Sequence, residues 1–139
     1  MSAADPPPPQ PDAEVLDFAH MLFDLARDGE AEQLAAYLDA GLTPNLTNDK
    51  GDTLLILAAY RGHPSTVRVL VEHGADVSRA NDRGQTALAA AVFKQSAETV
   101  QLLLDAGADE NDGSPSAIDT ARFFDLPAMI ALLDAKAGR

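Results

Sequence analysis

Residues Gly51 to Gly74, GDTLLILAAYRGHPSTVRVLVEHG, contain the pattern on which the rest of this chain is built. It contains two short apolar segments, Leu54 to Ala59 and Thr66 to Val71, which a Gly-His-Pro break separates. The same arrangement returns in the stretch from Gly84 to Gly107, so that Gly51 corresponds to Gly84. A fixed period of this size is the signature of a protein built from stacked repeats.

Each repeat is predicted to be a projecting turn followed by two antiparallel helices. The tetrapeptides at 48–51 and 81–84, Asn-Asp-Lys-Gly and Asn-Asp-Arg-Gly, have the composition of tight turns. Pro64 suits the first turn of a second helix, where its missing N–H group loses no hydrogen bond. His73 falls at the end of that helix, where a partial positive charge interacts favourably with the helix dipole.

The N-terminal part predicts a tail and a first helical hairpin. Residues 1–12, MSAADPPPPQPD, are predicted to be a disordered tail with polyproline II character. They match the PxxP ligand pattern, but any run of four prolines does so. Helices are expected from Ala13 to Ala26, with Asp12 as N-cap and Gly29 as stop, and from about Glu30 to Ala40. We expect the outer side of this hairpin to be polar, as a terminal capping repeat requires.

The residues 51–78, GDTLLILAAYRGHPSTVRVLVEHGADVS, resemble an ankyrin repeat, whose pattern is G-x-TPLHLAA-x-x-GH, an apolar helix, and GAD-V-N. The following unit resembles it through Gly84, Thr86, Leu88, Ala91, Val100, Leu103, Leu104, Gly107, Ala108 and Asp109. The resemblance implies an all-α ankyrin solenoid with projecting hairpin loops. Its repeats would be 14–47 as N-cap, 48–80, 81–113 and 114–137 as C-cap, within a domain at 13–139.

Departures from the family pattern carry their own predictions. TPLH is replaced by TLLI at 53–56 and by TALA at 86–89, so the His that ties neighbouring turns in the family is absent and weaker bonding between repeats is expected. The Gly-His pair is replaced by Gln95-Ser96 and by Asp125-Leu126. A left-handed backbone at these non-glycine residues would cost about 1 kcal/mol each.

Composition excludes several classes of protein. The 139 residues include no cysteine, which rules out a disulfide framework and fits a reducing compartment. No basic and apolar leader and no apolar run near the roughly 18 residues of a membrane span is present, so a cytoplasmic protein is expected. The net charge of -12 argues against general binding to nucleic acid or anionic membranes. Residues 49–94 are nevertheless balanced, with six basic and five acidic residues.

In proteins that resemble ankyrins, the turn tips and the exposed ends of the first helices line a concave binding face. Tyr60, Phe93 and Phe123 would form an aromatic ladder there, and Lys50, Arg61, Arg83 and Lys94 a positive strip, which suits a partner with acidic and apolar groups. The alternatives are rings that fold into the core, Phe124 first among them, and charges that only aid solubility. The predicted partner-binding residues are Asp49, Lys50, Asp52, Tyr60, Arg61, Asp82, Arg83, Gln85, Phe93, Lys94 and Phe123.

No catalytic, cofactor or metal site is predicted. The three histidines, His20, His63 and His73, lack a recognisable catalytic or metal-ligand pattern, and the pair Asp109-Glu110 reads as a solvated turn. The leading hypothesis is a monomeric, non-catalytic module that binds a protein partner. The alternatives are a small regulator that occludes an enzyme or a nucleic-acid-binding groove, a mimic of nucleic acid, and a hydrolase.

Overall fold

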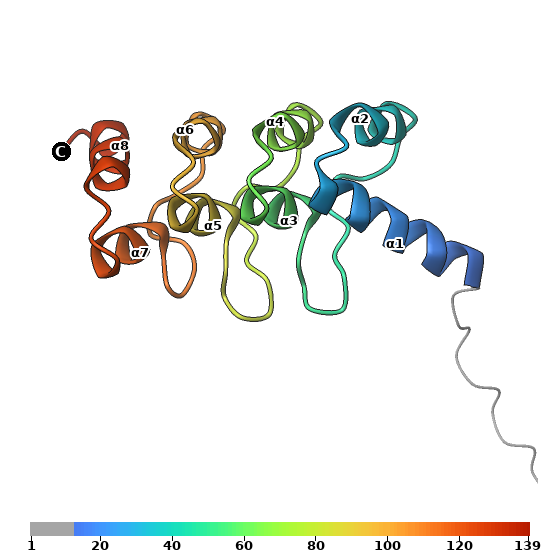
Figure 1. Ribbon diagram of the computed structural model, residues 1–139, viewed down its shortest axis with the longest axis horizontal. Helices are drawn as coiled ribbons and strands as arrows, with labels where there is room; N and C mark the ends of the chain where they lie inside the picture. Colours follow the sequence, from blue (N-terminus) through green and yellow to red (C-terminus); the bar gives the residue numbers. More distant parts are fainter. Residues whose placement is uncertain (1–12) are drawn as a thin grey trace, which may run out of the picture.

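The computed structural model describes residues 13–139, and this part of the chain forms four stacked helix pairs. The predicted tail and the predicted N-cap Asp12 lie outside the described residues. Two parallel rows of helices run along the molecule, with α1, α3, α5 and α7 in one row and α2, α4, α6 and α8 in the other (Figure 1). The helices are α1 (Ala13–Asp28), α2 (Ala31–Asp39), α3 (Leu54–Tyr60), α4 (Pro64–Glu72), α5 (Ala87–Phe93), α6 (Ala97–Asp105), α7 (Ala117–Phe123) and α8 (Pro127–Ala137).

The starts of the helices follow from local sequence. Thr53, Thr86 and Ser116 precede α3, α5 and α7, and each side-chain oxygen accepts a hydrogen bond from the backbone N–H three residues later, at 3.0, 3.1 and 3.2 Å. This contact satisfies one of the N–H groups that a helix start leaves without an internal partner. Pro64 begins α4, as predicted, and Pro127 begins α8 in the same way.

The row of α1, α3, α5 and α7 is held together by small and apolar side chains. Ala58, Ala91 and Ala121 have no exposed surface, and their size lets consecutive helices approach closely. Leu55 and Leu88, each 1% exposed, fill the space between the rows. These are positions that the repeat period assigned to the core, so the predicted stacking is confirmed.

The projecting turns repeat one hydrogen-bonded geometry. The Asn48 side-chain oxygen accepts from the N–H groups of Lys50 and Asp52, both at 3.0 Å. Asn81 does the same for Arg83 and Gln85, at 3.0 and 2.9 Å. An Asn that bonds to the backbone two and four residues later closes each turn without help from the helices.

Neighbouring turns are tied to each other by groups other than the missing family His. The N–H of Asp82 donates to the Lys50 carbonyl at 3.0 Å, and the N–H of Ser114 donates to the Gly84 carbonyl at 2.8 Å. Gly51, at φ 76°, is needed here, since a Cβ would come within 2.5 Å of an Asp82 carboxylate oxygen. These bonds join the turns of successive repeats directly, without the family His.

Asp52 is part of this tie and is not at an exposed turn tip. Its side chain is 8% exposed, and its Oδ1 accepts from the Asn81 amide nitrogen at 2.7 Å. The expectation that Asp52 is free at a turn tip is therefore wrong, because the next turn packs over it.

Two helix ends use a left-handed residue that is not glycine. Gln95 and Asp125 have φ values of 55° and 52°, at the positions where Gly62 ends the equivalent segment of the second repeat with φ 76°. Both sites therefore keep the left-handed backbone under which the cost was expected. A side chain in this region is strained, since Cβ approaches the neighbouring carbonyl.

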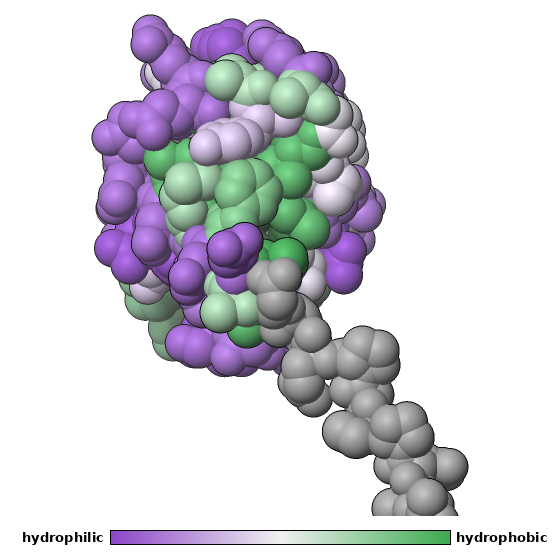
Figure 2. All heavy atoms as spheres, turned by 90° about the vertical axis from the view of Figure 1, so that its right-hand side faces the viewer, coloured by the Kyte–Doolittle hydropathy of each residue, from purple (hydrophilic) through white to green (hydrophobic). Residues whose placement is uncertain are grey.

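The N-terminal end of the stack differs from the prediction. Figure 2 shows an apolar surface on this end, with polar residues around it. Phe18 is 41% exposed and packs edge-on against Tyr37 of α2, with ring centroids 5.3 Å apart. The expected polar outer side is therefore wrong, because α1 exposes the apolar side chains of Val15, Leu16 and Phe18.

The C-terminal end is closed by an ion-pair cluster. Arg139 donates to Glu110 through both terminal guanidinium nitrogens, and its Nη2 lies 2.7 Å from the Asp134 carboxylate. Glu110 is 9% exposed, so the interpretation of Asp109-Glu110 as a solvated turn is wrong for Glu110. Arg139, from the far end of the last repeat, compensates for its burial.

Candidate functional site

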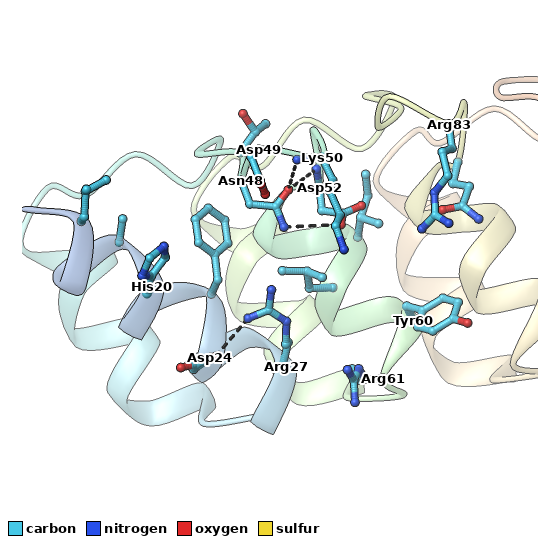
Figure 3. Close-up of a pocket in the computed structure, with 17 residues that line it drawn as sticks. His20, Asp24, Arg27, Asn48, Asp49, Lys50, Asp52, Tyr60, Arg61 and Arg83 are labelled. Carbon is cyan, nitrogen blue, oxygen red and sulfur yellow. Dashed lines mark hydrogen bonds and ion pairs between the residues drawn. The ribbon is translucent and has the colours of Figure 1, made fainter. Parts of the chain in front are cut away.

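A concave groove lies between the first helices of the stack and the first two projecting turns. Its volume is about 890 Å³. It is lined by Leu16, Phe23 and Arg27 of α1, by Ile56 and Leu57 of α3, and by residues of the two turns, among them Lys50 and Arg83 (Figure 3). The groove exists because the turns project beyond the helices (Figure 1).

Basic side chains gather in this groove although the chain is acidic overall. Arg27 comes from α1, Lys50 from the first turn, Arg61 from the end of α3 and Arg83 from the second turn. In Figure 3, Arg27 points up from its helix and Arg83 down from its turn, so both guanidinium groups face the groove.

These cations differ in whether they form an ion pair with a carboxylate. Arg27 forms an ion pair with Asp24 at 3.0 Å. Within residues 13–139, no carboxylate lies within ion-pair distance of Lys50, Arg61 or Arg83. Asp24, Asp49 and Asp52 also line the groove, and Asp52 accepts a hydrogen bond from Asn81. The groove therefore presents, beside these carboxylates, three cationic groups that form no ion pair within residues 13–139.

Aromatic side chains continue the site beyond the groove. Tyr60 and Phe93 are each 45% exposed, and the Lys94 ammonium nitrogen lies 4.9 Å from the centroid of the Tyr60 ring. Phe124 is 50% exposed and meets Phe93 edge-on, with centroids 5.4 Å apart. Phe123 is 82% exposed and touches Phe124, at 4.9 Å.

The predicted ladder of rings is thus exposed, but its order differs from the prediction. The ring that contacts Phe93 is Phe124, and the expectation that Phe124 is the ring most readily buried is wrong. Because Phe124 follows the last residue of α7, it points back along the stack toward α5, whereas Phe123 points to solvent.

The structure brings most of the predicted partner-binding residues together. The groove is lined by Asp49, Lys50, Asp52, Tyr60, Arg61, Arg83 and Gln85. Phe93 adjoins Tyr60 and Gln85 in a neighbouring apolar pocket, and Lys94 lies over the Tyr60 ring. Asp82 is at the tip of the second turn and bonds to the first turn through its backbone, and Phe123 lies outside both cavities.

Arg27 and Phe124 line the site, although they were not among the predicted partner-binding residues. Arg27 occupies the position of Tyr60 one repeat earlier, so the period contained the signal for its place in the groove. Phe124 follows Phe123 at the end of α7, the place that the repeat pattern assigns to the binding face, and its ring contacts Phe93.

The histidines His63 and His73 take structural positions at the boundary between the first two repeats. The His63 ring packs over Gly29 and its Nε2 lies 2.6 Å from the Arg27 carbonyl oxygen. His73 bonds through Nε2 to the Asp39 carboxylate at 2.7 Å and through Nδ1 to the Val69 carbonyl at 2.8 Å. The bond to Asp39, followed by that to Val69, raises the pKa of His73 above its usual value.

The described part of the chain shows neither a cluster of metal ligands nor a membrane-spanning helix. Residues 13–139 contain no group of three or more His, Cys, Asp or Glu side chains that could hold a metal ion. None of the eight helices in this range combines the length and the apolar character that crossing a bilayer requires.

The chain is similar to known proteins along its repeats. The family described as ankyrin repeats (3 copies) matches residues 22–113. An ankyrin repeat protein of Pseudomonas aeruginosa, PA3287, is 54% identical over 65 residues, which are 47% of this chain and 38% of that protein. An ankyrin repeat-containing protein of Schizosaccharomyces pombe is 34% identical over 53 residues, 38% of this chain and 26% of that protein.

A third match is the potassium channel AKT2/3 of Arabidopsis thaliana, which is 38% identical over 61 residues, 44% of this chain and 8% of the channel. The chain thus spans less than two fifths of the length of each of these three relatives. The similarity is one of repeats, and each relative contains much sequence that this chain does not match.

Proposed function

The chain belongs to the ankyrin repeat family, and we propose that it is a non-catalytic module that binds a protein partner through its concave groove. Repeats of this family are generally protein–protein interaction modules and are typically non-catalytic. The observation that supports this most is the set of three cations, Lys50, Arg61 and Arg83, which have no ion-pair partner within residues 13–139 and lie beside a half-exposed tyrosine. Arg and Tyr are the residue types that dominate binding energy at interfaces.

The groove suits a partner because its parts are held in place before binding. Lys50 and Arg83 extend from turns that Asn48 and Asn81 close and that Asp52 ties together. Tyr60 and Arg61 stand at the end of a helix packed on both sides. Little backbone ordering is therefore needed on binding, which preserves affinity.

The charge of the groove favours a partner segment that carries carboxylates. Groups of opposite charge across an interface set which partner is accepted and accelerate the encounter. A nucleic acid is a poorer candidate, because the net charge of -12 repels a polyanion at long range and three such cations are few for phosphate binding.

A charge reversal tests the proposal. Affinity capture from cells with the full chain is compared with capture by the variant R61E/R83E, and co-purifying proteins are quantified by mass spectrometry. We expect direct partners to be lost from this variant. The matched control is R79E/R122E, which makes the same change in net charge at two exposed arginines outside the groove and should retain them.

Retention of the same partners by R61E/R83E, with its helical circular dichroism intact, would refute binding through the groove. The variants are expected to fold, because neither arginine takes part in an ion pair within residues 13–139.

A further inference from the structure

An apolar pocket of about 190 Å³ lies beside the groove, between α3, α5 and α7. Tyr60, Phe93 and Phe124 form its walls, and Ala89 and Ala90 of α5 lie at its floor. The two cavities adjoin, because Ile56, Tyr60 and Gln85 line both of them.

The pocket exists because one repeat carries small residues where the preceding repeat carries large ones. Ala89 and Ala90 are the equivalents of Ile56 and Leu57 in the preceding repeat. Ile56 and Leu57 line the groove beside α3, whereas the methyl side chains of Ala89 and Ala90 line a pocket beside α5 together with the rings of Tyr60, Phe93 and Phe124.

The size and walls of the pocket fit one apolar side chain. A dry apolar cavity of about 150 Å³ accommodates benzene. The walls are aromatic rings that expose 45 to 50% of their surface to water, so a side chain that enters removes apolar surface on both partners. Aromatic rings around a pocket next to polar groups are the usual setting of an interface hot spot.

Charge beside the pocket indicates what else the partner carries. Lys94 lies over the outer face of the Tyr60 ring, and Arg83 and Arg61 belong to the adjoining groove. A segment seated in the pocket would therefore continue along cationic groups in both directions from Tyr60. Carboxylates flanking the apolar side chain would meet these cations.

We propose that this pocket anchors one large apolar side chain, of the size of Leu, Met or Phe, from an acidic segment of the partner protein whose carboxylates lie in the cationic groove. The inference rests on the proposed function and adds to it the partner's second recognition element. Binding then requires both elements in one segment, so an acidic peptide without the apolar residue, or an apolar one without acids, binds weakly.

Selection of peptides provides a probe of known composition. A phage-displayed library of random peptides is selected on the full chain, and the enriched sequences are determined. We expect acidic residues around one large apolar residue at a fixed position. Enriched peptides without such a residue, or no enrichment at all, would overturn the inference.

A coupling experiment then places the anchor. The selected peptide and its variant with Ala at the apolar position are titrated by fluorescence anisotropy against the wild type and against A90L, which fills the pocket. We expect A90L to lower the affinity for the first peptide by about tenfold or more and to leave the affinity for the second unchanged. The control A135L adds the same side chain at an exposed position on α8 and should change neither.

A second variant covers the case in which A90L distorts the stack, which its melting temperature would reveal. F124A removes a half-exposed side chain of the pocket, so the fold should tolerate it. We expect it to lower the affinity for the first peptide as much as A90L does and to leave the affinity for the second unchanged. Equal weakening of both peptides by F124A, or none, would refute the anchor.

The failure of this inference is distinguishable from failure of the proposed function. If the anchor is wrong but the groove binds, peptide affinity still falls with R61E/R83E and is insensitive to A90L and F124A. If affinity is insensitive to R61E/R83E as well, both proposals fail.

Discussion

Replacing Asn81 by Ala should destabilise the protein more than the equivalent change in the preceding turn. The Asn81 side chain makes four hydrogen bonds. Its oxygen accepts from the N–H groups of Arg83 and Gln85, and its nitrogen donates to Asp52 Oδ1 at 2.7 Å and to Gln85 Oε1 at 2.9 Å. The bond to Asp52 is buried and crosses from one repeat to the next.

The magnitude follows from what the substitution leaves without a partner. Each neutral hydrogen bond contributes about 0.5–1.5 kcal/mol net, and one to a charged group about 1.5–3 kcal/mol. Gln85 is only partly buried, so water can replace Asn81 there. Asp52 remains buried and keeps its longer side-chain contact to Asn48, at 3.4 Å. We therefore expect a loss of about 3 kcal/mol for Asn81→Ala.

Urea unfolding followed by circular dichroism measures this loss. With a slope of about 1–3 kcal/mol per molar urea, the midpoint should fall by about 1–3 M. Asn48→Ala is the matched control, because Asn48 closes the same type of turn but its side-chain bonds within residues 13–139 stay in that turn; it should lose about half as much. Equal losses in the two variants would refute the idea that the bond between the turns carries the difference.

Three further changes test separate parts of the fold. The hydrogen bond to Asp39 raises the pKa of His73 in the folded state. The stability that His73 contributes is therefore present below the unfolded pKa of about 6.5 and is lost as pH rises through the folded pKa. The unfolding free energy of the wild type should exceed that of His73→Gln at about pH 5.5 and not at about pH 8.5. Equal differences at the two pH values would contradict this assignment. Gln95→Gly, which relieves a left-handed residue, should raise the unfolding free energy by up to about 1 kcal/mol in urea unfolding, and a loss would show that the Gln95 side chain contributes more than the strain. Arg139→Met should lower the melting temperature, since Glu110 is left buried without its cation, and the double variant with Glu110→Gln should recover part of the loss.

Much of the fold could be predicted because its determinants are local or periodic. The repeat period placed Leu55, Leu88 and the buried alanines in the core, and the turn tetrapeptides were recognisable from Asn, Asp and Gly alone. The left-handed backbone at Gln95 was predictable for the same reason, since equivalent positions in a repeat share a conformation. Each of these depends on a few neighbouring residues and on register.

The errors concern contacts between repeats and at the ends of the stack. Asp52 looked like an exposed acid because its own turn leaves it free, and the next turn buries it. Glu110 was predicted to be solvated because its partner Arg139 lies far from it in the sequence. The first hairpin was predicted to have a polar outer side, but Phe18 is exposed there. A pattern of residue types does not specify how far one turn projects over another.

The stack of ankyrin repeats and the residue types at its turns and helix ends follow from the amino-acid order alone, because periodicity defines equivalent positions. Which of these residues contact one another depends on the packing of the folded chain. The groove forms because turns from successive repeats project over the same row of helices, and the pocket beside it because Ala89 and Ala90 face the rings of two neighbouring repeats. Both cavities are set by distances between repeats, and packing of the whole stack fixes those distances.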